Sequence, residues 1–420
     1  MPRFFACHRS VFHPVTWTLL FSVAPGVAGI QSPIHAEDVL PLEGPSFSAR
    51  LASVDNKQFV FLPLEEKQQH RALAADEFVR WSHPVAPRAS MHVLLTRGDV
   101  IVAAEDWTGD ESVRMDGNVL TVVTEGCDEI ELPRQVVKAI RFSQHGDSIN
   151  RGSRPALPSS GNTRTDTLYL NNGDRLRGTV TTLNGKEVVL QTQSATRRFA
   201  VPQVESVVFN PSLLEPSGKR AARLAVGLQD GSLFYATDLT VDGERFEIVL
   251  GEGNRLEGRD PKKIVFLQAL HGPRFQYLSQ TEPADYRHVP YLNIPWPYGR
   301  DQNLLGGRLQ SNGKFYLAGL SAHSASRMIY PLDGRFRRFE AEVALDDTVG
   351  RRGSVVFRVY LVREGQLQEA FVSKILRGGD PPQPVTVDLE GAQHLALVVD
   401  YADRGDELDH ANWLDARLVK

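Results

Sequence analysis

The stretch Leu168-Tyr169-Leu170-Asn171-Asn172-Gly173-Asp174 decides the fold class of this chain. An apolar run typical of a strand ends in a polar turn built on glycine and aspartate, and a second strand follows. Glycine supplies the positive φ that a tight hairpin needs, and Asn or Asp tolerates it next best. The same arrangement recurs at Val93–Asp99 and at Leu224–Gly231. The chain therefore contains a predicted repeat of β structure.

Each repeat also closes on a similar apolar triplet. The triplets are Ile140-Arg141-Phe142, Val207-Val208-Phe209 and Ile264-Val265-Phe266. A shorter first copy is predicted from Phe47 through Asp55-Asn56 to Phe78-Val79-Arg80. Units of roughly fifty residues with these features are typical of small β-barrels or of a stacked β array. We expect an all-β protein whose N-terminal part is an array of small β-barrel-like repeats.

The repeats and the breaks between them divide the chain into predicted segments. The stretch from His145 to Thr165 is rich in Gly, Ser, Pro, Asn and Arg and reads as a linker, and a shorter break lies at 211–219. The predicted segments are a signal peptide (1–36), a β-rich region of one or two units (45–144), the linker (145–165), two further β repeats (166–210 and 221–270) and a C-terminal block (275–420).

Composition excludes several classes of protein. The chain has 420 residues with 47 Lys and Arg against 51 Asp and Glu, a net charge of -4, so a strongly basic phosphate-binding surface is not expected and nucleic acid is not a predicted partner. Cysteine occurs at Cys7 and Cys127 only. Neither a disulfide framework nor a cysteine-ligated zinc site is therefore predicted.

The first 36 residues have the features of a secretory signal. Arg3 and Arg9 precede an apolar run from Val15 to Ile30 that proline and glycine interrupt, and Ala28 and Ala36 are both suitable cleavage positions. The run is shorter than the roughly 20 residues of a membrane span. We expect cleavage after Ala36 and export to the periplasm, the cell surface or the medium, with no membrane span afterwards. An uncleaved anchor is the alternative.

Motifs that carry enzymatic chemistry are missing from the sequence. It contains no His-Glu-x-x-His zinc pair, no Gly-x-Ser-x-Gly elbow and no Gly-x4-Gly-Lys-Ser/Thr phosphate loop. Gly251-Glu252-Gly253 begins like a dinucleotide fingerprint, but Leu256 stands where the third glycine belongs. We therefore predict no catalytic residues and no required cofactor.

The C-terminal block alternates apolar and other residues as the strands of an antiparallel β-sandwich do. The predicted inward-facing sets are Phe339, Ala341, Val343 and Leu345; Val355, Phe357, Val359 and Leu361; Val385, Val387 and Leu389; Leu395, Leu397 and Val399; and Leu414, Ala416 and Leu418. Glycine-rich connections and the lack of helical periodicity support this prediction.

A series of motifs in this block occurs in an order that points to a known family. They include Pro295-Trp296-Pro297-Tyr298, Gly319-Leu320-Ser321-Ala322-His323-Ser324, Tyr330-Pro331-Leu332-Asp333-Gly334, Gly353-Ser354-Val355-Val356-Phe357, Asp388-Leu389-Glu390-Gly391-Ala392 and Asp409-His410-Ala411-Asn412-Trp413-Leu414-Asp415-Ala416-Arg417-Leu418. Residues 275–420 thus resemble the NPCBM/NEW2 family, a carbohydrate-binding module also found with family 98 glycoside hydrolases. The resemblance implies a galactose-binding-like jelly roll and suggests galactose-containing glycans as ligands. Ser321 departs from the family, which usually has glycine there.

Sugar binding needs planar side chains for C–H faces and fixed polar groups for hydroxyls. If Leu414, Ala416 and Leu418 face the core, Trp413 lies on the other face of its strand, beside polar groups of the preceding loop. The predicted carbohydrate-binding residues are His323, Asp409, His410, Asn412, Trp413 and Trp296. Packing of Trp413 under a loop, a structural role for His323 and anchoring of the chain by Trp296 are the alternatives.

The acids Asp400, Asp403, Asp406, Glu407 and Asp409 crowd one loop, which predicts either a structural Ca²⁺ or a solvated acidic turn. Together these features predict an exported, non-catalytic carbohydrate-binding protein. Its glycan lies on the C-terminal sandwich, and its repeats act as a scaffold or contact envelope proteins. The alternatives are a glycoside hydrolase that uses the sandwich as an accessory module, and a purely structural protein-interaction module.

Overall fold

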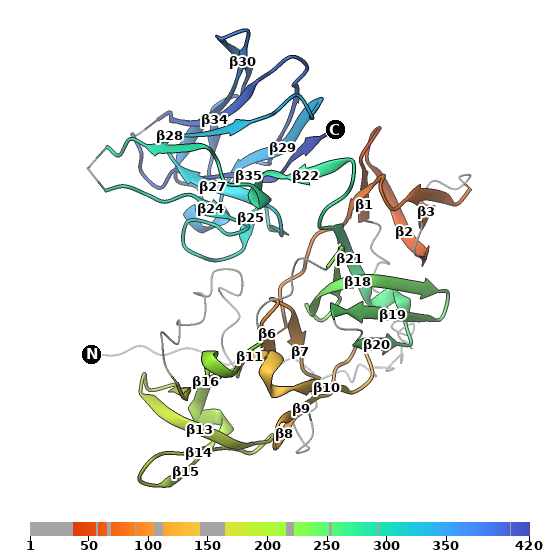
Figure 1. Cartoon of the computed structure of the whole chain (residues 1–420), viewed down its shortest axis with the longest axis vertical. Helices are drawn as coiled ribbons and strands as arrows, with labels where there is room; N and C mark the ends of the chain where they lie inside the picture. The colour runs from red at the N-terminus through yellow and green to blue at the C-terminus, as the bar shows by residue number, and fades with distance from the viewer. Residues whose placement is uncertain are drawn as a thin grey trace, which may run out of the picture. The chain divides into compact units, whose positions relative to one another are not determined.

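The computed structural model describes residues 37–420 except 56–57, 65–68, 89, 105–111, 143–163, 216–221, 252–253, 292–293 and 404. The predicted signal peptide and nearly all of the predicted linker lie outside the described residues. The contacts group the described residues as one compact unit. Within the described residues the chain forms β-strands and short 3₁₀ helices, with no α-helix (Figure 1). The predicted all-β class is confirmed.

The N-terminal strands form four groups, which we name units I to IV. Unit I contains β1 (Glu37–Pro41), β2 (Phe47–Val54), β3 (Gln58–Pro63), β4 (Arg71–Ala74) and β5 (Phe78–Trp81). Unit II contains β6 (His92–Leu95), β7 (Val100–Val102), β8 (Val113–Asp116), β9 (Val119–Val122), β10 (Ile130–Pro133), η1 (Arg134–Val136) and β11 (Val137–Arg141).

Units III and IV have the same order of elements. Unit III contains β12 (Asp166–Leu170), β13 (Arg175–Leu183), β14 (Glu187–Gln191), β15 (Thr196–Ala200), η2 (Val201–Gln203) and β16 (Val204–Val208), and η3 (Pro211–Leu213) follows it. Unit IV contains β17 (Leu224–Leu228), β18 (Leu233–Asp242), β19 (Arg245–Leu250), β20 (Arg255–Gly258), η6 (Pro261–Lys263) and β21 (Ile264–Ala269).

The first turns of units II, III and IV have the same conformation. Gly98, Gly173 and Gly231 have φ between 89° and 97°. In each turn the glycine N–H donates to the carbonyl three residues earlier, at 2.9–3.0 Å. Because only glycine adopts this φ without a steric cost, the glycine of each sequence motif is what permits this turn. The predicted repeat is confirmed at these three turns.

The units associate through their last strands. β5 of unit I pairs with β21 of unit IV, with Trp81 opposite Leu267, and β11 of unit II pairs with β16 of unit III, with Ala139 opposite Val208. Each pairing satisfies the backbone groups of an edge that would otherwise be open to aggregation. One continuous apolar core runs through the four units.

The remaining strands form a β-sandwich and, in two of them (Leu309–Ser311 and Lys314–Tyr316), a separate two-stranded sheet. They are β22 (Phe275–Tyr277), β23 (Asp285–His288), β24 (Gly299–Arg300), β25 (Leu309–Ser311), β26 (Lys314–Tyr316), β27 (Gly319–His323), β28 (Ser326–Pro331), β29 (Arg338–Leu345), β30 (Ser354–Arg363), β31 (Gln366–Val372), β32 (Leu376–Arg377), β33 (Gln383–Asp388), β34 (His394–Tyr401) and β35 (His410–Val419), with η7 (Leu278–Gln280) and η8 (Asp347–Val349). One sheet has the order β24-β27-β35-β29-β33, and the other has the order β23-β28-β34-β30-β31. A second apolar core fills the space between them.

The predicted inward faces of β29, β30, β33 and β34 are confirmed, whereas for β35 the prediction holds at Ala416 and Leu418 and is wrong at Leu414. Trp413, Ala416 and Leu418 lie in the sandwich core, whereas Leu414 packs outside it with Leu309 and Tyr316. Asp415 has φ +48° and forms a bulge, where the register against β29 shifts. Since a bulge adds one residue to one strand, it exchanges the two faces beyond it. Simple alternation therefore fails at this strand.

The outer face of β35 contacts units I and IV through buried polar groups. Arg80 Nε of β5 lies 2.9 Å from Asp415 Oδ2, and both side chains are less than one-tenth exposed. Gln268 of β21 donates to the hydroxyl of Tyr277 at 2.9 Å. Units I and IV thus cover this part of the sandwich sheet.

Candidate functional site

Two histidines meet where β27 ends and β35 begins. His323 and His410 are directly opposite one another in the ladder between these strands. Opposite residues of an antiparallel pair point to the same face, so the two imidazoles lie together with ring centroids 5.8 Å apart. Ala322 and Ala411, their neighbours in the chain, face the sandwich core. The histidines therefore lie on the outer side of the sheet.

Trp296 packs on this histidine pair and is partly exposed. Its ring is parallel to that of His323, with centroids 5.1 Å apart and a 7° angle between the planes, and its centroid is 5.5 Å from that of His410. The Trp296 backbone N–H donates to Nδ1 of His288 at 3.0 Å, and the Tyr286 hydroxyl donates to its carbonyl at 2.7 Å. Two hydrogen bonds therefore hold the backbone of this tryptophan in place.

His288 connects Trp296 to the loop that follows β27. Because its Nδ1 accepts a hydrogen bond, the neutral ring carries its proton on Nε2, which donates to the Ser324 carbonyl at 2.9 Å. His323 Nδ1 lies 2.8 Å from the same carbonyl. Burial lowers the pKa of His323 and of His410 below the ordinary value. Both rings are therefore neutral at pH 7.

Asp409 lies beneath this cluster and is fully buried. Its Oδ2 accepts from the Ser324 hydroxyl at 2.6 Å, and its Oδ1 accepts from the Ser354 backbone N–H at 2.8 Å. Burial, together with the nearby acids Asp406 and Glu407, raises the pKa of Asp409 to about 6, although the two hydrogen bonds lower it. The carboxylate joins the loop after β27 to the start of β30.

Asp409→Asn is expected to remove a pH dependence of stability. The native pKa of about 6 exceeds the ordinary value of 3.8, so the folded protein binds this proton more tightly than the unfolded chain does. The contribution of Asp409 to stability therefore falls as pH rises from about 4 to about 6, by at most about 3 kcal/mol. Thermal melts from pH 4 to 7 measure it. The difference in Tm between wild type and Asp409→Asn declines over this window, and a constant difference would contradict the assignment.

The C-terminal part of the chain matches a known domain family. The NPCBM/NEW2 domain family matches residues 275–419. Residues 275–419 are an NPCBM/NEW2 domain. A protein of Renibacterium salmoninarum named "Putative endo-alpha-N-acetylgalactosaminidase" is 29% identical over 114 residues, which are 27% of this chain and 7% of that protein. The chain thus spans a small part of the relative that it matches.

Solved structures of carbohydrate-binding modules from Clostridium perfringens are also similar. CBM51 from GH95, in complex with methyl-galactose, is 26% identical and covers 34% of this chain and 99% of its own, with a TM-score of 0.31. A structure of CBM51-2 and INT domains of ZmpB, with GlcNAc, is 22% identical and covers 44% of this chain and 37% of its own, also with a TM-score of 0.31.

No helix in the described part of the chain has the length and hydropathy of a membrane span.

The structure separates the six predicted binding residues. Trp296, His323, His410 and Asp409 lie close together in the NPCBM/NEW2 domain, and Trp296 is partly exposed whereas the other five predicted residues are buried. Asn412 is buried and donates to Asp346 at 2.8 Å, and that carboxylate also accepts from the backbone of Gln310 at 3.2 Å. The prediction that Asn412 contacts the sugar directly is therefore wrong, and this residue has a role in packing instead.

Trp413 requires a second correction. It has no exposed surface, and its ring packs edge-on against Phe357 with centroids 5.0 Å apart. The bulge at Asp415 makes Ala416, rather than Leu414, the next core residue, so the tryptophan faces inward. It cannot serve as a platform for a sugar.

His288 and Ser324 belong to the cluster, and the sequence prediction missed both. His288 lies eight residues before Trp296 in a stretch that contains Pro290 and Pro295, and such a stretch folds back on itself. That spacing was the available signal. Ser324 follows His323 directly, inside the motif that the resemblance had identified.

The acidic loop binds arginines in the structure. Asp400 accepts from Arg358 at 2.8 Å, and Asp403 accepts from Arg377 at 2.5 Å. Among the described residues no group of three or more His, Cys, Asp or Glu side chains is placed to hold a metal ion. The predicted structural Ca²⁺ stays a prediction without support from the geometry of this loop.

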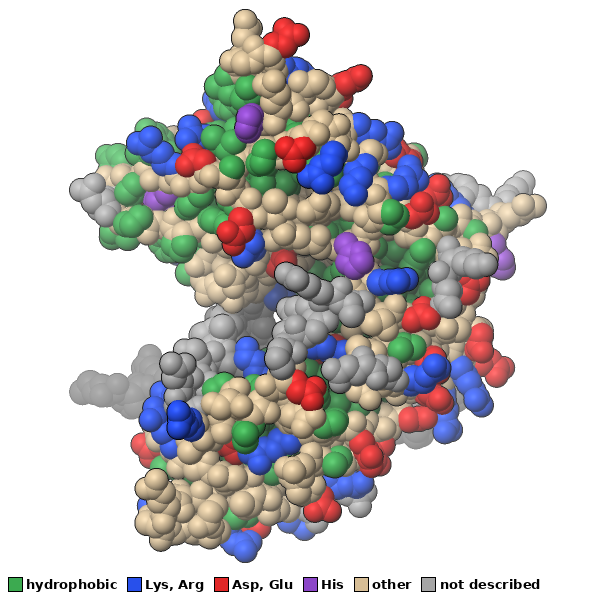
Figure 2. Space-filling model, in the orientation of Figure 1, with side chains coloured by type: hydrophobic (Ala, Val, Ile, Leu, Met, Phe, Trp, Pro, Cys, Tyr) green, Lys and Arg blue, Asp and Glu red, His purple; other side chains and the backbone are tan. Residues whose placement is uncertain are grey.

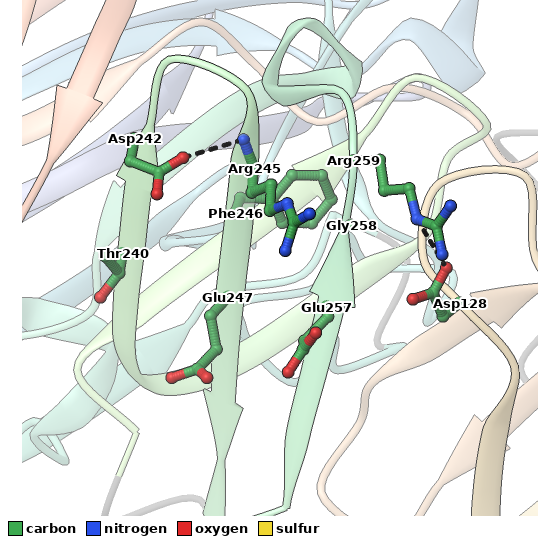
Figure 3. A pocket seen from close by; sticks show the side chains of 9 residues that line it. All are labelled: Asp128, Thr240, Asp242, Arg245, Phe246, Glu247, Glu257, Gly258 and Arg259. Carbon is green, nitrogen blue, oxygen red and sulfur yellow. Dashed lines mark hydrogen bonds and ion pairs between the residues drawn. The ribbon is translucent and has the colours of Figure 1, made fainter.

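A hollow with a volume of about 360 Å³ lies on the sheet of β18, β19 and β20, away from the histidine cluster in the sequence (Figure 3). Glu247 and Glu257 are directly opposite one another there, but Arg255 donates to Glu247 at 2.7 Å. The ring of Phe246 lies against Gly258 and is almost fully buried. This hollow offers no exposed aromatic face, which distinguishes it from the surface at Trp296.

Charges of both signs are interspersed over the face seen in Figure 2.

Proposed function

We propose that this protein binds glycan through its NPCBM/NEW2 domain, at the surface formed by Trp296 and the adjacent histidines, and that it performs no catalysis there. The observation that carries the proposal is the partly exposed Trp296, held by His288 and stacked on His323, within a domain of a carbohydrate-binding family. The six-residue prediction is thereby reduced to Trp296, with His323, His410 and Asp409 supporting it.

The chemistry of the cluster suits a neutral sugar ring. The C–H face of a sugar packs against the exposed part of Trp296, and the buried, neutral imidazoles of His323 and His410 hold that ring in position. The resemblance to the family suggests galactose-containing glycans as the class to test first. Affinity is expected to be modest, because sugar hydroxyls exchange bonds to water for bonds to protein at a small net gain.

The proposal extends to the rest of the chain. We place the protein outside the cytoplasm, because the first 36 residues have the pattern of a secretory signal. Units I to IV act in this proposal as a scaffold that carries the sandwich and contacts envelope proteins. Their association through paired last strands, and the buried contacts of Asp415 and Tyr277, support the scaffold role.

Trp296→Ala is expected to weaken galactoside binding at least tenfold, because the ring supplies the apolar contact and each 1.4 kcal/mol is worth a factor of ten. Isothermal titration with residues 37–420 measures it. Leu367→Ala, which truncates another exposed apolar side chain, is the control and should bind as wild type does. A broad glycan panel that produces no heat, or an unchanged affinity in Trp296→Ala, would refute the proposal.

A further inference from the structure

A small hollow lies on the other side of Asp409 from the histidine cluster. It has a volume of about 140 Å³ and is lined by Arg351, Arg352, Gly353, Ser354, Arg377, Asp403 and Glu407. Three arginines line this space, and their like charges repel one another at short range unless an acid or a bound anion balances them. The hollow is large enough for a sulfate or a carboxylate group.

The charges of the hollow are only partly balanced within the protein. Arg377 donates to Asp403 at 2.5 Å, so this pair is neutral. Arg351 and Arg352 are exposed, and no carboxylate of the described residues lies within ion-pair distance of either guanidinium. Glu407 is the remaining acid in the lining. The hollow therefore presents two unpaired cations against one unpaired anion.

The backbone that carries these arginines is tightly packed. Gly353 has φ +76°, and a Cβ there would lie 2.5 Å from the Leu408 carbonyl oxygen. Glycine is therefore required where the chain passes from Arg352 to β30. The chain directly after the arginine pair is thus packed against the loop that holds Glu407 and Asp409.

Asp409 connects the hollow to the Trp296 surface. One carboxylate oxygen accepts from Ser324, next to His323, and the other accepts from Ser354 in the lining of the hollow. The two places are thus separated by one carboxylate and its two hydrogen bonds.

We propose that this hollow binds the anionic substituent, a sulfate ester or a carboxylate, of the glycan whose neutral ring lies at Trp296. Arginine forms paired, charge-assisted hydrogen bonds to such oxyanions, and it does so better than lysine because its donors lie in one plane. The inference rests on the proposed function and narrows its ligand to acidic glycans. The negative charge of Glu407 repels the bound anion and therefore weakens its binding.

The test compares three saccharides with residues 37–420 by isothermal titration: galactose, galactose 6-sulfate and galacturonic acid. Wild type is expected to bind the two acidic sugars about tenfold more tightly than galactose, and this preference falls as NaCl rises from 50 to 500 mM. The double variant Arg351→Gln/Arg352→Gln should bind all three equally. Glu407→Gln should strengthen the acidic sugars alone, by several-fold. Arg335→Gln removes an exposed arginine elsewhere and is the matched control.

The outcomes separate this inference from the proposed function. Equal affinity of wild type for neutral and acidic sugars overturns the anion site and leaves glycan binding in place. A preference for acidic sugars that persists in Arg351→Gln/Arg352→Gln also overturns it. Inorganic sulfate alone is the fourth probe. If no saccharide binds but sulfate does, and the double variant loses it, the anion site stands while the proposed function fails.

Discussion

Arg80→Met is expected to lower the free energy of unfolding by about 3–5 kcal/mol. The variant keeps an apolar side chain of similar length but leaves the carboxylate of Asp415 buried without its arginine, 2.9 Å from where the cation was. Burial raises the pKa of Asp415 above the ordinary value, and Arg80 and Arg417 are the groups that lower it. Removal of Arg80 therefore leaves a buried charge that is stabilised only in part, by Arg417 and by the Gln268 side-chain N–H at 3.3 Å. Urea unfolding at pH 7 measures the loss.

Two further variants show whether the effect belongs to the pair. Asp415→Asn tolerates the positive φ of the bulge and removes the charge, so Arg80→Met/Asp415→Asn should recover part of the loss. Arg327→Ala breaks an ion pair with Asp285 in which both side chains are about half exposed, and it should cost less than about 1 kcal/mol. Equal losses of unfolding free energy in Arg80→Met and Arg327→Ala would show that the buried pair stabilises the fold no more than an exposed pair does.

The pair also determines how the domain should be studied. Residues 275–420 alone would expose Asp415 and Tyr277, together with the apolar residues Phe275 and Val419 that belong to the N-terminal core. Such a fragment presents unpaired polar groups and an apolar face to solvent. For this reason the binding experiments above use residues 37–420.

The sequence predicted those parts of the fold that depend on local chemistry. The glycine turns at Gly98, Gly173 and Gly231 were predictable because a positive φ selects glycine at each of them. Four of the sandwich strands followed from alternation, since both sheets bury one face. The pairing of β5 with β21 and of β11 with β16 joins distant segments. No local pattern specifies such pairings.

The candidate site was predicted in part, for a related reason. His323 and His410 were named as candidates because each lies in a motif of the family, and the structure shows that their strands are adjacent in space. The bulge at Asp415 reversed the faces of β35, and an aspartate gives no strong sequence signal for a bulge as a glycine would. Trp413 was therefore assigned to the surface although it lies in the core. His288 was missed because its role depends on the fold of a proline-rich stretch.

Trp413→Ala tests this correction, because a buried residue and a sugar platform fail in different ways. The ring fills the core between Phe357 and Phe339, so its removal leaves a cavity and should cost about 3–5 kcal/mol of unfolding free energy. Trp413→Phe should cost less. It keeps an aromatic ring, and the indole N–H that it removes has no hydrogen-bond partner among the described residues.

The decisive measurement combines stability with binding in the same samples. At a temperature where Trp413→Ala is still folded, its galactoside affinity should stay within about twofold of wild type, because the residue has no surface with which to contact a ligand. Trp296→Ala should show the opposite pattern, with weakened binding and a small change in stability, since its ring is partly exposed. Weakened binding by Trp413→Ala at unchanged stability would mean that the indole reaches the ligand. The assignment of Trp413 to the core face of β35 would then be wrong.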